Sequence, residues 1–190
     1  FKVRDATPVT LEVLDEQGRP TTAAFEIRNA QGRIYPAQWK RLPPDFSFHP
    51  QVYRSAGEVV ELPSGTYTFK CNRGPEYFEQ VRTVEVTSQP QQLTFELVRW
   101  IDPASMGWWS GDHHIHAAGC KHYDDPAKGI TPSAMIRHAL GEDLKVGAVL
   151  SWGPGFDYQK QFFTGRTDAV SQYPYLLRYD VEVAGFGSQK

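Results

Sequence analysis

Residues 65–72, Gly-Thr-Tyr-Thr-Phe-Lys-Cys-Asn, alternate polar and apolar side chains over the length of a β-strand. Successive side chains of a strand point to opposite faces of its sheet, so Tyr67, Phe69 and Cys71 share one face. A period of two is typical of an antiparallel strand with one buried face. We therefore expect this strand to place an apolar stripe, including a buried Cys71, in a hydrophobic core.

The same alternation recurs on both sides of this stretch, from Val9 to Leu97, with turn residues between the apolar runs. A sheet with one apolar face needs a second layer to cover that face. The pattern therefore predicts an N-terminal antiparallel β-sandwich over residues 1–103. The expected core positions are Val9, Leu11, Val13, Phe25, Ile27, Leu93, Phe95 and Leu97.

Between Tyr35 and Gly57 the alternation stops, because four prolines interrupt any regular element. We expect a long structured loop here. Its aromatic side chains have two interpretations: they cover an end of the sandwich, or they recognise a glycan or protein partner. The residues concerned are Trp39, Phe46, Phe48 and Tyr53.

After Asp102-Pro103 the pattern changes to an α/β type. We expect strands at 108–116, 146–150 and 176–183, and a helix at 131–140 that begins at Thr131-Pro132 and stops at Gly141. Three strands and one helix do not close a barrel, so residues 104–190 are expected to be the N-terminal part of a larger (β/α) domain. The fold class is therefore α+β multidomain, a sandwich followed by a strand-helix-strand segment.

The composition is that of an ordinary soluble protein, with 190 residues, 40% hydrophobic side chains, 22% charged side chains and a net charge of -2. This charge balance argues against nucleic acid as a partner. No apolar run approaches the roughly 20 residues of a membrane span, so no transmembrane segment is expected. Cys71 and Cys120 fall in different predicted domains, which argues against a disulfide framework.

Histidines are concentrated in one short segment. His113, His114, His116 and His122 fall within ten positions, alongside Asp112, Asp124 and Asp125. On a strand His114 and His116 share a face, while His113 faces away, and two imidazoles on one face can chelate zinc, with manganese or iron as alternatives. Asp112 is expected on the same face, as a ligand or as an acceptor that fixes a histidine tautomer. The alternative is a polar strand end without metal.

Glu182 shares a face of the last expected strand with Asp180. This alternation alone is ordinary for an amphipathic strand. A carboxylate at the end of a neighbouring strand is, however, what a two-metal site would need to bridge its cations.

The segment Gly107-Trp108-Trp109-Ser110-Gly111-Asp112-His113-His114-Ile115-His116 resembles the opening of the polymerase and histidinol phosphatase (PHP) metallohydrolase superfamily, in its CehA/McbA-like branch. That branch carries a Gly-Trp-x-Ser-Gly-Asp-x-His-x-His motif at the start of a distorted (β/α)-barrel. A β-sandwich often precedes this barrel in the chain. The resemblance implies that His114 and His116 are the first pair of metal ligands. It also implies that Glu182 is the bridging glutamate.

The N-terminal half is similar to the carboxypeptidase regulatory-like, transthyretin-type sandwich at Asp15-Glu16-Gln17-Gly18-Arg19-Pro20 and Leu62-Pro63-Ser64-Gly65-Thr66-Tyr67. The barrel segment departs from its family at one place. A typical member carries an Asp-His pair after the second apolar strand, whereas Ser151-Trp152-Gly153 stands here. The number of metals and the reaction therefore stay open.

The resemblance implies a metal-dependent hydrolase in which metal-activated water attacks a phosphoester, carbamate, amide or ester, with Asp112 as a catalytic residue and a small-molecule or glycan-like substrate. The 190-residue chain is expected to lack turnover, because it does not contain the later ligands and pocket walls of such a barrel. The alternative is a glycan- or protein-binding sandwich attached to a degenerate metal site. The resemblance favours a secreted or periplasmic protein, with a cytoplasmic one as the alternative.

Overall fold

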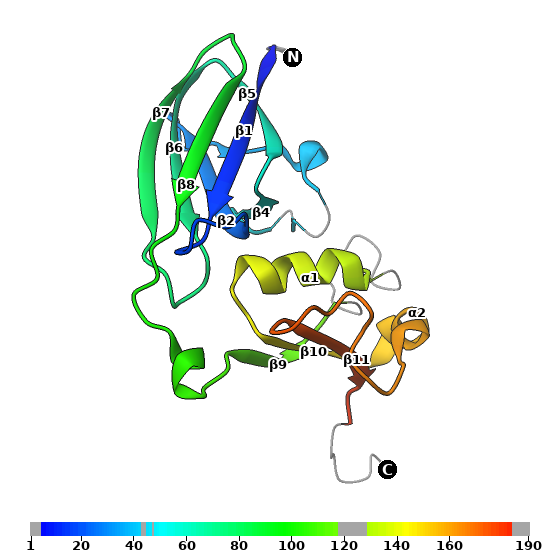
Figure 1. Ribbon diagram of the computed structural model, residues 1–190. Helices are drawn as coiled ribbons and strands as arrows, with labels where there is room; N and C mark the ends of the chain where they lie inside the picture. The colour runs from blue at the N-terminus through cyan, green and yellow to red at the C-terminus, as the bar shows by residue number, and fades with distance from the viewer. Residues whose placement is uncertain (1–4, 43–44, 47, 118–128, 184–190) are drawn as a thin grey trace. The chain divides into compact units, whose positions relative to one another are not determined.

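The computed structural model describes residues 5–42, 45–46, 48–117 and 129–183 (Figure 1). The chain divides into two compact units. The first comprises Phe1–Trp108 and Leu140–Asp143, and the second comprises Trp109–Ala139 and Leu144–Lys190. Each unit has a hydrophobic core of its own.

The first unit is a β-sandwich-like domain of two sheets. One sheet has the order β5-β1-β8, with β1 at Ala6–Leu14, β5 at Glu58–Pro63 and β8 at Gln91–Glu96. β1 pairs antiparallel with β5 but parallel with β8, so the prediction of a purely antiparallel sandwich was wrong at this pair. A parallel pair needs a long connection, and β1 and β8 are the first and last strands of the unit.

The second sheet is antiparallel throughout. Its order is β3-β2-β6-β7, and β4 also pairs with β2. The strands are β2 at Thr22–Asn29, β3 at Ile34–Tyr35, β4 at Val52–Ser55, β6 at Gly65–Asn72 and β7 at Gln80–Val86.

The side chains that the alternation predicted as core residues all lie in the core of the sandwich. Val9, Leu11, Val13, Phe25, Ile27, Tyr67, Phe69, Cys71, Leu93, Phe95 and Leu97 are all buried. Phe95 meets Phe25 edge to face with ring centroids 5.1 Å apart, and also contacts Phe69. Aromatic pairs in this geometry add to the stabilisation that burial provides.

Side chains of β7 satisfy backbone groups of β8 where the edges of the two sheets come together. Arg82 Nη1 donates to the carbonyl of Thr94 at 2.5 Å, and the Gln80 side chain donates to the carbonyl of Glu96. In the other direction, Gln91 Nε2 donates to the carbonyl of Glu85 at 3.1 Å. Backbone acceptors at these sheet edges are thereby paired within the chain.

The expectation of a loop from Tyr35 to Gly57 was wrong in part, because the stretch contains β4 and a 3₁₀ turn at Gln38–Lys40. Arg54 of β4 is fully buried and pairs with Asp45 at 2.7 Å. A buried charge inside a four-residue strand breaks the alternation of apolar and polar residues, so periodicity alone could not reveal it.

The second unit contains a three-stranded sheet in the order β11-β10-β9, with β9 at Gly111–Ile115, β10 at Val146–Ser151 and β11 at Leu176–Val181. Both pairings are parallel. Helix α1, Pro132–Gly141, connects β9 to β10 and covers one face of the sheet (Figure 1). The buried core lies between them and contains Ala117, Met135, Val149, Leu177 and Tyr179.

Short helical turns occur at the ends of the second unit's strands and in the preceding connection. They are the 3₁₀ turn η2 at Pro103–Met106, the 3₁₀ turn η3 at Gly153–Gly155, the single-turn helix α2 at Phe156–Gln159 and the 3₁₀ turn η4 at Lys160–Phe162. The last three fall in a stretch rich in glycine and aromatic residues, where no helical periodicity of useful length exists.

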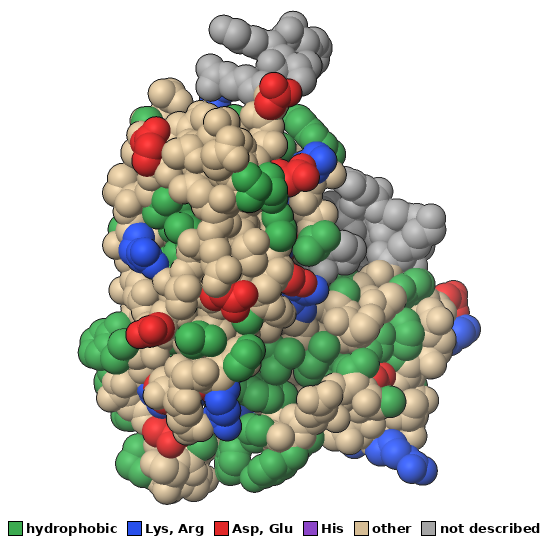
Figure 2. All heavy atoms as spheres, turned by 45° about the horizontal axis from the view of Figure 1, so that its top comes forward, with side chains coloured by type: hydrophobic (Ala, Val, Ile, Leu, Met, Phe, Trp, Pro, Cys, Tyr) green, Lys and Arg blue, Asp and Glu red, His purple; other side chains and the backbone are tan. Residues whose placement is uncertain are grey.

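None of the helices in the described ranges is long and apolar enough to cross a membrane. On the face drawn in Figure 2, lysine and arginine side chains are scattered singly among acidic ones. This face carries no extended area of one charge.

Arg99, after β8, is the centre of a charged cluster in the first unit. Its Nε lies 2.9 Å from Glu16 Oε1, its guanidinium also contacts Glu76, and it lies 4.3 Å from the ring centroid of Tyr77. Tyr77 Oη donates to Glu16 Oε2 at 2.8 Å. Burial alone would raise the pKa of Glu16, but hydrogen bonds from Tyr77, the backbone and Arg99 lower it below its ordinary value.

The core predicts the effect of Phe95→Ala. Removing a fully buried ring that contacts two others should lower the free energy of unfolding by about 3–5 kcal/mol. Chemical denaturation measures this change. The neighbouring exposed Thr94→Ser should cost less than about 1 kcal/mol, and equal losses for both variants would contradict the assigned core.

The lowered pKa of Glu16 predicts a pH dependence of stability. Because the folded-state pKa lies below the unfolded one, the contribution is complete above the unfolded value and is lost as pH falls through the folded value. Between about pH 5 and pH 3 the wild-type chain should lose more stability than Glu16→Gln. Denaturant titrations at several pH values test this, and parallel curves for the two proteins would refute it.

Candidate metal centre

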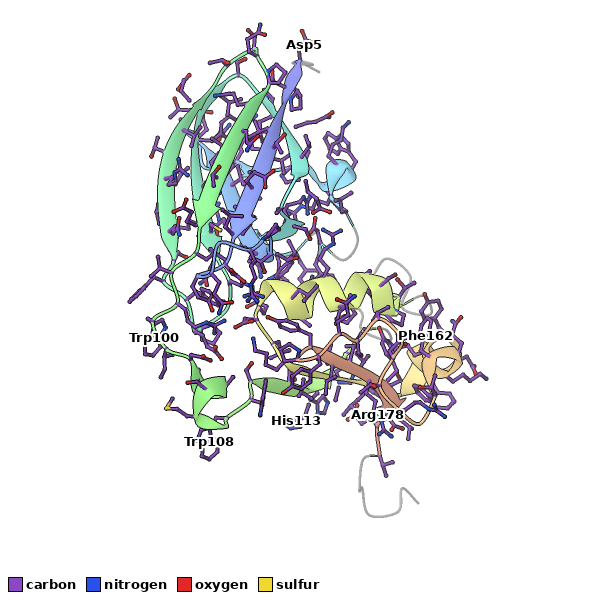
Figure 3. The ribbon with its side chains drawn as sticks, in the orientation of Figure 1. Asp5, Trp100, Trp108, His113, Phe162 and Arg178 are labelled. Carbon is purple, nitrogen blue, oxygen red and sulfur yellow. The ribbon has the colours of Figure 1, made fainter. Side chains whose placement is uncertain are left out.

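The two faces of the β9-β10-β11 sheet differ sharply. Gly147 and Val149 of β10 face the α1 side, where a Cβ on Gly147 would lie 3.1 Å from Leu177 Cδ1. By alternation, the other face carries Ala148 and Leu150 of β10 and Arg178 and Asp180 of β11. We call this second face, together with His114, His116 and Glu182 at its end, the open face. Figure 3 shows Arg178 on the side of the sheet away from α1.

β9 contains one extra residue relative to β10. Asp112 pairs with Gly147 and Ile115 pairs with Val149. An interval of three residues along β9 therefore lies opposite an interval of two residues along β10. This bulge interrupts the alternation between Asp112 and His114. The strict period of two that suggested a common face for these residues therefore does not extend through β9.

The structure brings His114, His116 and Glu182 together at the C-terminal end of the sheet. The two Nε2 atoms lie 3.0 Å apart. Glu182 Oε1 lies 3.6 Å from His114 Nε2, and Oε2 lies 3.5 Å from His116 Nε2. One ligand atom from each of the three residues lies within 4.8 Å of the ligand atoms of the other two.

These separations fit a single tetrahedral ion. With zinc–ligand bonds of about 2.0–2.1 Å, two ligands of a tetrahedral zinc lie about 3.3 Å apart. The three measured separations, 3.0, 3.5 and 3.6 Å, fall on both sides of this value. Glu182 Oε2 is buried and makes no hydrogen bond within the described part of the chain, so a cation would satisfy it. The donor set of two imidazoles and one carboxylate suits zinc and also manganese or iron.

The backbone of Glu182 is held by the central strand. Its N–H donates to the carbonyl of Ser151 at 3.0 Å, which continues the parallel ladder one residue past β11. The Ser151 hydroxyl donates to Gln159 Oε1, and both side chains are buried. Ser151, which stands where the resembled family carries an acidic ligand, thus has a partner on α2. This pair could not be predicted, because Gln159 lies in a stretch of sequence without periodicity.

Asp112 and His113 lie outside the three-ligand group. Asp112 Oδ1 accepts a hydrogen bond from the His114 N–H at 2.9 Å, which fixes the backbone that presents His114. The His113 ring is exposed, with its centroid 6.5 Å from that of His114. A catalytic role for Asp112 stays a prediction. Cys120, His122, Asp124 and Asp125 lie outside the described residues.

The aromatic residues of the first unit's long connection do not act as one group. Tyr53 is buried, whereas Trp39 is 83% exposed and Phe48 is 48% exposed. Phe46 and Phe48 stack with ring centroids 5.1 Å apart. The expected covering role therefore applies to Tyr53 but not to Trp39.

Comparisons with known proteins give little guidance. No family model matches the chain, and no curated protein matches it. A solved structure of the major pilin subunit of Bacillus cereus matches with a TM-score of 0.34 and 16% identity. That match covers 49% of this chain and 30% of the pilin chain. A likeness this weak supports no conclusion about function.

The Ser151–Gln159 pair predicts a non-additive effect on stability. Ser151→Ala leaves the buried Gln159 amide without its partner and should cost about 1–3 kcal/mol in the free energy of unfolding. Adding Gln159→Leu replaces the orphaned amide with an apolar group and should recover most of that loss. Denaturant unfolding of both single variants and the double variant measures the coupling; additive losses would contradict a direct bond.

Proposed function

We propose that this protein is a metal-dependent hydrolase whose ion is held by His114, His116 and Glu182. The convergence of these three ligand atoms supports the proposal most strongly. Histidines two positions apart on one strand end, with a carboxylate from the next strand but one, form an arrangement that amphipathic alternation alone does not require. Zinc is our first choice, with manganese and iron as alternatives.

The chemistry follows from the ligand set. When bound, a divalent ion would lower the pKa of a coordinated water toward neutrality and polarise the scissile group. His114 and His116 would each donate an imidazole lone pair through Nε2, which requires neutral rings. Glu182 would contribute the negative charge that offsets part of the cation. Asp112 would keep His114 in place through the backbone bond that it accepts.

The family resemblance supports the same reading. The motif from Gly107 to His116 matches the opening of CehA/McbA-like PHP enzymes, and Glu182 corresponds to their bridging glutamate. We therefore propose that residues 104–190 belong to a PHP-type barrel. Phosphoesters, carbamates, amides and esters are all compatible substrate classes at this level.

A binding role for the sandwich is the second candidate. It draws on Trp39, whose ring is 83% exposed and free to stack on a sugar. The buried Tyr53 takes no part in such a surface. This role is compatible with the metal centre and independent of it.

Metal analysis of the purified chain tests the proposed centre. After dialysis against zinc, the wild-type chain should retain about one ion per molecule, the content of a single tetrahedral site. The His114→Ala/His116→Ala variant should retain none, and Glu182→Gln should bind zinc more weakly because it lacks the charge. Elemental analysis and a competitive chelator titration give the content and the affinity.

His113→Ala is the matched control, since it removes an exposed imidazole beside the site and should leave the metal content unchanged. Circular dichroism of each variant confirms that the fold is retained. Wild-type protein that holds no zinc, or zinc that persists in the double variant, would rule out these ligands.

A further inference from the structure

A cavity of about 220 Å³ lies in the first unit beside the edge strand β5. The residues that line it come from the 3₁₀ turn at Gln38–Lys40 and its flanks, from β4 and from β5. They are Pro36, Lys40, Leu42, Arg54, Val59, Val60 and Glu61. At about 30 Å³ for each water of the liquid, this volume accommodates one small organic molecule.

The cavity has a buried end and an exposed mouth. Arg54 is fully buried, whereas Leu42 and Val59 are close to half exposed. Lys40 Nζ lies 3.1 Å from Glu61 Oε2, and both of these side chains are about half exposed. A ligand that enters the cavity would therefore pass aliphatic side chains and meet a guanidinium at the far end.

Arg54 has hydrogen-bonding capacity that the described part of the chain does not use. Its Nη1 donates to Asp45 Oδ2 at 2.7 Å and to the carbonyl of Tyr53 at 2.6 Å. Its Nε is buried and has no hydrogen-bond partner among the described residues. A buried donor without an acceptor is unfavourable, so an acceptor supplied by a ligand would be stabilised there. The planar guanidinium matches the geometry of a carboxylate.

Positive charge exceeds negative charge around the buried end. Among the described residues, Arg41 and Arg54 share a single carboxylate, that of Asp45. Arg41 donates to backbone carbonyls instead of to a second acid. Burial lowers the pKa of Arg41, Asp45 offsets part of this effect, and the charge of Arg54 lowers the pKa further. The Lys40–Glu61 pair at the mouth is neutral, so the surroundings of the cavity favour an anion.

We propose that this cavity binds a small monocarboxylate, with the carboxylate against Arg54 and the alkyl group between Leu42 and Val59. The guanidinium supplies the charge and the donor, and the aliphatic walls favour a short alkyl chain over a polar one. The site uses none of the proposed metal ligands and is independent of the proposed hydrolase function.

Titration of the nitrogen-15-labelled chain with butanoate, followed by heteronuclear NMR, tests the proposal. Amide signals of residues 36–42 and 52–61, which surround the cavity, should shift and reach saturation. Butyramide has nearly the same shape without the charge. It should bind about tenfold more weakly, because it cannot form charge-assisted hydrogen bonds with Arg54.

Substitutions at both ends of the cavity test the same site. Arg54→Met/Asp45→Asn removes the buried ion pair without leaving either charge alone, and should weaken butanoate binding about tenfold. Val59→Glu places a like charge at the mouth and should also weaken it. Val59→Thr is the matched control, since it keeps the size of the side chain without a charge and should bind butanoate as the wild-type chain does. The dispersion of the amide signals confirms that each variant is folded.

The His114→Ala/His116→Ala variant should bind butanoate with wild-type affinity, which separates this cavity from a carboxylate bound at the proposed metal centre. A wild-type chain without saturable shifts around the cavity would overturn the proposal. Equal affinities for butanoate and butyramide would overturn the assignment of a carboxylate, and wild-type affinity in Arg54→Met/Asp45→Asn would overturn the role of Arg54. Should that variant not fold, the comparison of Val59→Glu with Val59→Thr decides: equal butanoate binding by these two variants would overturn the site.

Discussion

The parallel pairing of β9 and β11 on the two sides of β10 is the constraint on which the proposed site depends. Parallel strands end at the same edge of a sheet, so His116 and Glu182 come together although they are distant in the sequence. The hydrogen bond from the Glu182 N–H to the Ser151 carbonyl extends this pairing beyond the last strand residue. On the opposite face of this sheet, the buried core that includes Val149 packs against α1 and holds the three strands in register.

Much of the fold could be predicted from the sequence, because the residues within each strand are enough to show which of its faces is buried. The alternation around Phe69 and Phe95 identifies core positions, since a period of two leaves only one way to bury them. The parallel pairing of β1 with β8 could not be predicted, because it joins segments about 80 residues apart and nothing local encodes it. Arg54 was missed for a different reason: its burial depends on Asp45, a tertiary partner outside its strand.

Some features of the candidate site could likewise be predicted from the sequence, and others could not. His114 and His116 were predicted from residue type and spacing, and Glu182 was implied by the family resemblance; the structure brings the ligand atoms of all three together. Asp112 was assigned to the same face by strict alternation, which the bulge in β9 interrupts. A bulge depends on the register with the neighbouring strand, so the sequence of β9 alone does not specify it.

The contacts between β7 and β8 have a consequence for assembly. Arg82 and Gln80 occupy carbonyl acceptors of β8 that a strand from another molecule would need for edge pairing. An incoming chain would first have to displace a guanidinium and an amide that are already bonded. The sandwich is therefore protected at this edge against open-ended polymerisation through added strands.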